Sequence, residues 1–281
     1  FDGQDLLESG GATPGRLRDG WLNRALAPLS ADTVPAIALA QNTPLVLRGD
    51  NSVTSWAPSS LPDADDATIG RLQRLYADDE FFATRLEQAL RSQEIAMDMS
   101  HGSRRRGNDA RQFSELMQSA ARFLTAADGP RIAVVELGGW DTHANQGAAT
   151  GQLANRLGAL DTGLTSLRSG LGDAWSNTVI AVVTEFGRTV HVNGTRGTDH
   201  GTATAAMLLG GAVDGGKVVA DWPGLRDGDL YGGRDLQPTT DLRSVFKGIL
   251  EQHIDLSPAF IERNVFPDSR AANALPDLVR T

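Results

Sequence analysis

The sequence predicts an α/β protein with a mostly parallel sheet flanked by helices, formed as a single domain over residues 1–281. Two short apolar runs rich in Val and Ile, 131–137 and 178–184, have the composition of strands that are covered on both faces. Between them, segment 150–171 carries leucines at helical spacing. A strand, a long helix and a strand form a βαβ unit, whose right-handed crossover predicts parallel strands in one sheet.

Other segments predict further helices, short strands and loops. We expect a loop over 1–15, a short helix over 19–26 with Trp21 in the core, strands at 34–39 and 44–48, a surface loop over 51–66, two helices within 67–99, a helix at 112–127, a strand at 203–209, a Gly-rich loop over 215–231, and a helix at 240–254 capped by Asp241. The chain begins with Phe1 and its first strand-like run comes late, so we expect one or more N-terminal strands to be missing.

The composition excludes several classes of function. With 35 acidic and 26 basic residues, a net charge of −9 and a pI near 5.0, the chain lacks the basic surface that binds nucleic acid or anionic membranes. The only basic run, 104–106, is typical of a solvated loop. Cysteine is absent, which excludes disulfides and thiolate chemistry. No apolar stretch is long enough to span a membrane, and no signal peptide is visible.

Polar residues follow each of the two predicted strands. Asp141 and His143 come shortly after 131–137, and Glu185 comes directly after 178–184. Ligands of open α/β sheets bind at the carboxyl ends of the strands, so we expect these side chains at one edge of the sheet. A purely structural interpretation stays open, in which Asp141 caps the next helix and His143 is an ordinary surface residue.

The loop after Glu185 leads to the adjacent pair Asp199–His200, followed by a glycine. Such a pair offers one oxygen and one nitrogen ligand to a metal, and glycine lets the backbone turn tightly around it. Alternatively, Asp199 caps the following segment and His200 bonds to the backbone. Arg188 has two interpretations as well, since a guanidinium can bind the oxygens of an ester or form a salt bridge with Glu185.

Several motifs spread over the chain resemble one known family. The quoted stretches are FDGQDLLESG, DGWLNRAL, ELGGWDTHANQG, VVTEFGRT, GTDHGT, ADWPGL and TTDLRSVF. Through them the chain resembles the exported bacterial proteins of the domain of unknown function 1501, and these are similar to distant members of the alkaline-phosphatase and sulfatase superfamily. The resemblance implies an alkaline-phosphatase-like fold, a twin-arginine export signal ahead of this sequence, and a periplasmic or exported location.

The superfamily resemblance also implies a site with two divalent metal ions, zinc first, with manganese, calcium or magnesium as alternatives. Asp141 and His143 resemble the ligands of one metal. Glu185 stands where relatives carry an Asp–His pair for the second metal, and is followed here by Phe186. Two alignments are open: Asp199–His200 is the displaced pair, or His200 replaces a single late His ligand while Glu185 serves alone, which we prefer.

The implied function is metal-dependent hydrolysis of phosphate or sulfate esters, with Arg188 as the catalytic residue and a small-molecule ester or an anionic glycan as substrate. Asp141, His143, Glu185, Asp199 and His200 are the expected metal ligands. The rival hypothesis is a non-catalytic exported binding protein that keeps the fold and at most one metal. No spacing singles out a nucleophile among Asp2, Ser9 and Thr13.

Overall fold

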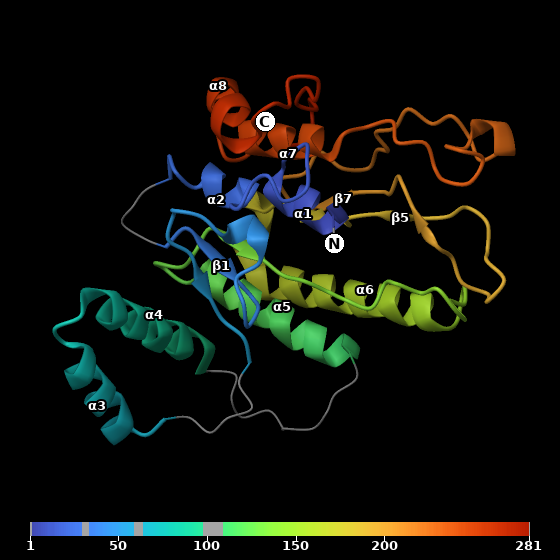
Figure 1. The fold of residues 1–281 in the computed structure, drawn as a ribbon. Coiled ribbons are helices and arrows are strands. Elements are labelled where there is room, and N and C mark those ends of the chain that lie inside the picture. Colours follow the sequence, from blue (N-terminus) through green and yellow to red (C-terminus); the bar gives the residue numbers. More distant parts are fainter. Residues whose placement is uncertain (1, 30–33, 59–63, 98–108, 281) are drawn as a thin grey trace.

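The computed structural model describes residues 2–29, 34–58, 64–97 and 109–280. A small parallel sheet lies at the centre and is flanked by helices, which confirms the α/β class (Figure 1). Its strands are β1 (Ala36–Ala38), β2 (Thr54–Ser55) and β3 (Ile132–Val134), in the order β2-β1-β3.

The two faces of this sheet bury alternate residues, as the period of two in a strand requires. Ile37 of β1 and Ala133 of β3 face one core, which is formed by helices α5 (Asp109–Thr125) and α6 (Gln152–Leu171). Ala36 and Ile132 face the opposite core, against α2 (Trp21–Ala25) and the 3-10 turn η1 (Leu45–Leu47). A sheet covered on both faces explains why its strands are apolar runs without alternation.

The N- and C-terminal parts of the chain share a third core. Trp21 is buried and stacks on Phe246, with ring centroids 4.5 Å apart, and also contacts Phe266. Phe246 lies on α7 (Leu242–Gln252), which Asp241 caps by accepting a bond from the backbone of Arg243. The short helix α8 (Pro258–Phe260) and the π-helical turn η4 (Ile261–Val265) complete this layer. The core position of Trp21 and the cap at Asp241 are both confirmed.

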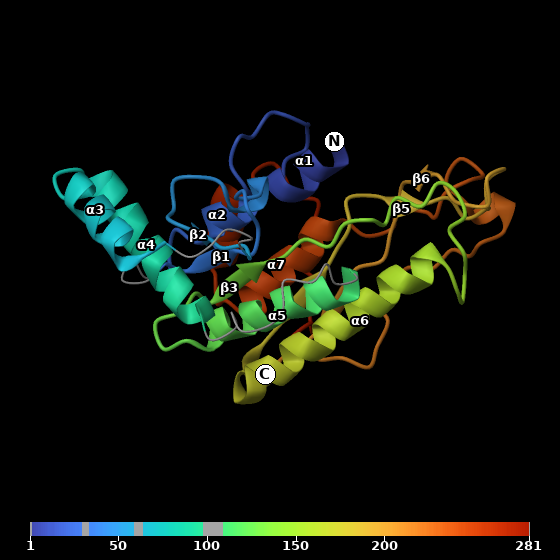
Figure 2. The same ribbon diagram turned by 90° about the horizontal axis from the view of Figure 1, so that it is seen from below.

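A long β-hairpin leaves this body and carries the candidate site. β4 (Ile180–Val182) pairs antiparallel with β7 (Met207–Leu209), and β5 (Gly187–Arg188) pairs antiparallel with β6 (His200–Gly201). A hydrogen bond of 3.0 Å between the hydroxyls of Thr184 and Thr204 connects the two arms between these pairs. The hairpin extends away from the central sheet beside the N-terminal half of α6 (Figures 1 and 2).

The predicted parallel pairing of 131–137 with 178–184 in one sheet is wrong. β3 belongs to the three-stranded sheet, whereas β4 takes its ladder bonds from β7 in a separate sheet. Parallel pairing needs a crossover connection, whereas antiparallel pairing needs only a hairpin. Here β4 pairs with β7, the strand on the other arm of the same hairpin. Ile180 of β4 and Ala133 of β3 nevertheless pack against the same hydrophobic core, so the two strands share side-chain packing but no backbone hydrogen bonds.

Helices predicted from periodicity are confirmed within the described residues. They are α3 (Asp66–Tyr76) and α4 (Glu80–Met97), which are separated at Asp78–Asp79, together with α5 and α6. The leucine stripe of α6 is only partly core, because α6 extends beyond α5 at its N-terminal end and leaves Leu157 49% exposed (Figure 2). The α3–α4 pair projects from the body, and no described helix is long and apolar enough to cross a membrane.

Several local predictions differ from the structure. Residues 1–15 contain helix α1 (Asp2–Ser9), because Gly10 is its C-terminal cap, with φ +68° and a bond from its N–H to the carbonyl of Leu6. The expected strand at 44–48 is the turn η1, which begins after the extended Pro44. The expected loop at 51–66 includes the edge strand β2. Of the strand expected at 203–209, only β7, Met207–Leu209, is formed. The loop at 215–231 includes the 3-10 turn η3 (Asp227–Asp229), and the 3-10 turn η2 (Gly172–Asn177) follows α6.

Two glycines on α6 test the packing between α5 and α6. A Cβ atom at Gly163 would lie 2.3 Å from Cδ1 of the buried Phe113, whereas one at the exposed Gly158 would meet nothing within 4 Å. We expect Gly158→Ala to stabilise the protein by about 1 kcal/mol through helix propensity. Gly163→Ala should instead destabilise it by about 1–3 kcal/mol, since the added methyl overpacks the core. Urea unfolding of both variants measures the difference, and equal effects would contradict this packing.

Candidate functional site

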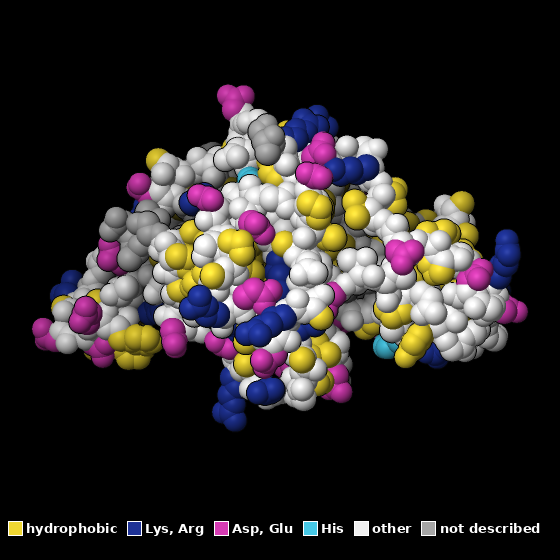
Figure 3. Space-filling model, turned by 90° about the horizontal axis from the view of Figure 1, so that it is seen from above, with side chains coloured by type: hydrophobic (Ala, Val, Ile, Leu, Met, Phe, Trp, Pro, Cys, Tyr) yellow, Lys and Arg dark blue, Asp and Glu magenta, His cyan; other side chains and the backbone are white. Residues whose placement is uncertain are grey.

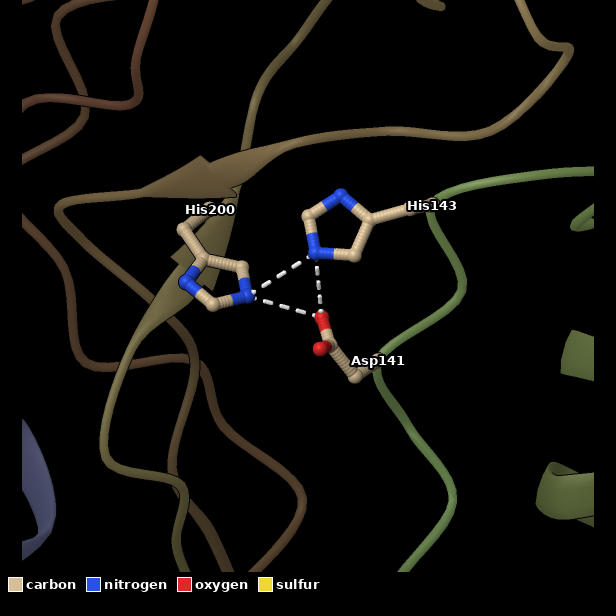
Figure 4. A group of neighbouring side chains, drawn as sticks. All are labelled: Asp141, His143 and His200. Carbon is tan, nitrogen blue, oxygen red and sulfur yellow. Dashed lines mark hydrogen bonds and ion pairs between the residues drawn. The ribbon is translucent and has the colours of Figure 1, made fainter. Parts of the chain in front are cut away.

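Asp141, His143 and His200 converge on one point at the surface of the hairpin (Figure 4). Oδ1 of Asp141 lies 2.8 Å from Nε2 of His143 and 2.7 Å from Nε2 of His200. The two Nε2 atoms are 3.1 Å apart, and the ring centroids are 4.8 Å apart. The three side chains are about half exposed, with 55%, 45% and 51% of their surfaces accessible, so the cluster is open to solvent. The structure thus brings together three of the five residues that the sequence predicts as ligands.

The residues of this cluster come from two segments far apart in the sequence. Asp141 and His143 lie in the irregular loop between β3 and α6, and His200 begins β6. Arg188 is paired with His200 in the register of the hairpin. The cluster is therefore formed where the hairpin lies against this loop, and not at the carboxyl edge of one sheet.

Backbone hydrogen bonds join the hairpin to the loop. The N–H of Asn145 donates to the carbonyl of Thr195, and the N–H of Gln146 donates to the carbonyl of Arg196, both at 3.0 Å. The side-chain oxygen of Gln146 accepts from the hydroxyls of Thr142 and Thr198, at 2.8 and 2.7 Å. The positive φ angles of Asn145 and Arg196, 50° and 60°, accompany the two turns that make this contact.

Asn193 fixes the tip of the hairpin on His143. Its Oδ1 accepts from the backbone N–H groups of Thr195 and Gly197, which can only donate, so the orientation of the amide is determined. Its Nδ2 consequently donates to the carbonyl of His143 and to Oδ1 of Asp199, both at 3.0 Å. The hydroxyl of Thr195 donates to the same carbonyl of His143 at 2.7 Å.

Asp199 and Glu185 lie outside the group of three potential ligands. Oδ1 of Asp199 lies 3.1 Å from Nδ1 of His143, on the side of the ring away from the cluster, so Asp199 contacts His143 and not the point where the three side chains meet. Glu185 is exposed, and no described contact brings its carboxylate to Asp141. The ring of Phe186 stacks on His200 with centroids 4.1 Å apart, so it covers one side of that imidazole.

Arg188 forms a salt bridge with Asp141. One of the two interpretations of Arg188 predicted a salt bridge with Glu185 instead. Its Nη1 lies 2.6 Å from Oδ1 of Asp141, its Nε donates to the hydroxyl of Thr198 at 2.9 Å, and its Nη2 donates to the carbonyl of Thr198. This guanidinium therefore joins the loop after β3 to the hairpin. Nε, Nη1 and Nη2 each donate to a protein atom here, and a contact of Arg188 with an ester stays a prediction.

Hydrogen bonds lower the pKa of both carboxylates of the site. The bond from Arg188 is the largest cause that lowers the pKa of Asp141, burial opposes it, and His200 and His143 lower the pKa further. The pKa of Asp199 is lowered mainly by the bond from Asn193 and then by His143. A carboxyl group with a lowered pKa stabilises the fold above its usual pKa, and this contribution is lost only as the pH falls through the lowered value.

The donor set fits a divalent metal ion. Two imidazole nitrogens and a carboxylate oxygen are the usual ligands of a catalytic zinc ion, which binds them at about 2.0–2.2 Å and keeps one further position open. Ligand atoms on a tetrahedral zinc ion lie about 3.3 Å apart at such bond lengths, so the three atoms here need to separate by only a few tenths of an ångström. All contacts of Asp141 described above use Oδ1, and Oδ2 is a second ligand atom of the same carboxylate.

The N-terminal helix reaches the neighbouring part of the hairpin. A Cβ atom at Gly3 would lie 3.0 Å from the carbonyl oxygen of Glu185, so the described start of α1 lies beside the segment that follows β4. Ser9 is fully buried and its oxygen accepts from the N–H of Gly11, so it has a structural role. Phe1 lies outside the described residues.

Comparison with known proteins identifies a family. A family model described as "Protein of unknown function (DUF1501)" matches residues 4–265, and the chain belongs to this family. No curated protein and no solved structure matches the chain.

Two glycines of the hairpin tip test its contact with His143. A Cβ atom at Gly197 would lie 2.2 Å from the carbonyl carbon and oxygen of His143, whereas one at Gly194 would meet nothing within 4 Å. Backbone atoms cannot rotate away, so we expect Gly197→Ala to lower the free energy of unfolding by about 1–3 kcal/mol. Gly194→Ala should change it by less than about 0.5 kcal/mol. Denaturant unfolding provides the measurement, and indistinguishable variants would show that the hairpin tip does not pack on His143.

Proposed function

We propose that this chain is a metal-dependent hydrolase of phosphate or sulfate esters, in which Asp141, His143 and His200 bind one divalent ion. The observation that supports it is the approach of three ligand atoms to within 2.7–3.1 Å of one another at an open surface. Zinc is the first candidate for a site with two imidazoles, and manganese, calcium or magnesium are alternatives. A bound ion of this kind activates water as a nucleophile and polarises an ester oxygen.

In this proposal some residues bind the ion, and others hold those residues in place. Asp141 supplies a carboxylate that stays ionised because of Arg188, and the two histidines supply neutral nitrogen ligands. The half-exposed side chains leave room for an ester or an anionic glycan to approach from solvent. Among the described residues, this is the one group of three or more potential ligands, which favours a single ion over the pair that the superfamily resemblance implies.

A non-catalytic exported binding protein is the second candidate. Two observations favour it, since the guanidinium of Arg188 is bound to Asp141 and Thr198 and Phe186 covers one side of His200. Such a protein keeps the metal and binds an anionic molecule without turnover. For either function we propose an exported or periplasmic location, as the family resemblance suggests.

Metal binding can be measured directly with two histidine variants. We expect about one equivalent of zinc per chain, and His200→Ala should weaken zinc binding by more than about 100-fold, because loss of a ligand costs more than loss of a partner of a ligand. His191→Ala is the matched control, since His191 lies in the same hairpin and its imidazole lies beside Asp227, at 3.4 Å, and outside the group of three ligand atoms. Competition with a chromophoric chelator gives both affinities.

The same titration defines the outcomes that would contradict the site. Unchanged zinc affinity in His200→Ala, or an equal loss in His191→Ala, would exclude the proposed ligands. His200 is half exposed, so the free energy of unfolding without metal should change by less than about 1 kcal/mol. A structural histidine would show the opposite pattern, with unchanged metal binding and clear destabilisation.

Turnover separates the two candidate functions. We expect the zinc-loaded chain to hydrolyse an aryl phosphate or an aryl sulfate, and we expect both His200→Ala and a chelator to abolish that activity. Stoichiometric zinc binding with no hydrolysis of either ester, across zinc, manganese, calcium and magnesium, would support the binding protein and exclude the hydrolase.

A further inference from the structure

The tip of the hairpin contains the pair Asn193–Gly194, the one place in the sequence where glycine follows asparagine. Asparagine is a thermolabile residue. A following glycine has no Cβ atom, so its backbone nitrogen approaches the side-chain amide of the asparagine with little hindrance. Gly194 is exposed, and a Cβ atom there would meet nothing within 4 Å, so water reaches the tip at this pair.

The reaction open to this pair needs water as its only other reactant. The backbone nitrogen of Gly194 bonds to Cγ of Asn193, the hydrogen of that nitrogen passes to the departing Nδ2, and ammonia leaves behind a cyclic imide. Water then opens the imide at one of its carbonyls. The product is aspartate with a normal backbone, or isoaspartate with a CH₂ group added to the backbone. Either product carries a carboxylate in place of the amide.

The closed hairpin opposes the first step of this reaction. Attack on Cγ makes that atom tetrahedral, so the side chain of Asn193 loses the flat amide geometry that its hydrogen bonds require. Four such bonds, each of 3.0 Å, join Oδ1 to the N–H groups of Thr195 and Gly197, and Nδ2 to the carbonyl of His143 and Oδ1 of Asp199. The two bonds from Nδ2 connect the tip to the rest of the site, so the reaction should proceed from an opened hairpin.

We propose that Asn193 is a deamidation site which the closed hairpin protects, and that its modification keeps an opened hairpin from closing again. A carboxylate cannot donate, so both bonds from Nδ2 are lost in the product. The new charge would also lie beside Asp199, whose Oδ1 is 3.0 Å from the present amide, and like charges at that distance repel. This inference concerns the contact of the hairpin with the loop and does not depend on the proposed metal site.

Peptide mapping by mass spectrometry measures the modification at position 193 over time. The folded parent chain should deamidate at least about 10-fold more slowly than the same chain unfolded in urea, because only the opened population reacts. Gly197→Ala, whose added Cβ would lie 2.2 Å from the carbonyl of His143, should move the folded rate toward the rate in urea. Gly194→Ala is the matched control: its Cβ meets no neighbour and hinders the attacking nitrogen, so this variant should react slowly even in urea.

The effect of the product on the hairpin is measured by amide hydrogen exchange. The N–H groups of Asn145 and Gln146 report on closure, since each donates over 3.0 Å to a carbonyl of the tip. In Asn193→Asp, which reproduces one product, these two groups should exchange at least about 10-fold faster than in the parent, because the open state is more populated. In Gly194→Ala they should exchange at the parent's rate.

Three results would overturn the proposal. Equal rates of deamidation in the folded and the unfolded parent would exclude protection by the closed hairpin. A parent chain that stays unmodified at Asn193 even in urea would exclude the site itself. Exchange in Asn193→Asp at the parent's rate would exclude the effect of the product on closure. Should Asn193→Asp not fold, the deamidated fraction of the parent, separated by its extra negative charge, supplies the same exchange measurement.

Discussion

The hydrogen bonds of the Asn193 amide are the interaction on which the candidate site depends. The hairpin that carries His200 projects from the body, and the loop that carries Asp141 and His143 has no regular structure of its own. One amide contacts the backbone of His143, the carboxylate of Asp199 and two N–H groups of the hairpin tip, and so makes the two segments one unit.

Around this unit the rest of the molecule acts as an anchor. β4 and β7 connect the hairpin to cores that also contain Phe113, Trp21 and α7, and α6 follows the loop directly. Exposed hydrophobic side chains include Leu75, Phe81 and Phe82 of the α3–α4 pair and Val218 and Trp222 of the loop at 215–231, and Figure 3 shows hydrophobic side chains spread over one face of the molecule. The hairpin that carries the site is anchored to the body through β4 and β7.

Local patterns in the sequence predicted what is encoded locally. Leucine periodicity identified α3 to α6, the residues after the apolar run 131–137 identified Asp141 and His143, and the Asp–His pair before a glycine identified His200. The partner of β4 was not predictable, because one apolar run pairs equally well with a parallel or an antiparallel neighbour. Asn193 and Gln146 were missed since a polar loop residue shows its role only when its distant partners are known. Glu185 was included because of an expected common sheet edge that does not exist.

The separation of the ligands along the chain has a consequence for folding. His143 and His200 are 57 positions apart, and an ion held between them would act as a cross-link that closes a loop of that length. Cross-links across long loops restrict the unfolded chain, and an ion that binds only the folded state adds stability in proportion to the logarithm of its concentration. A higher concentration of the ion would then favour the state in which this projecting hairpin is closed over its loop.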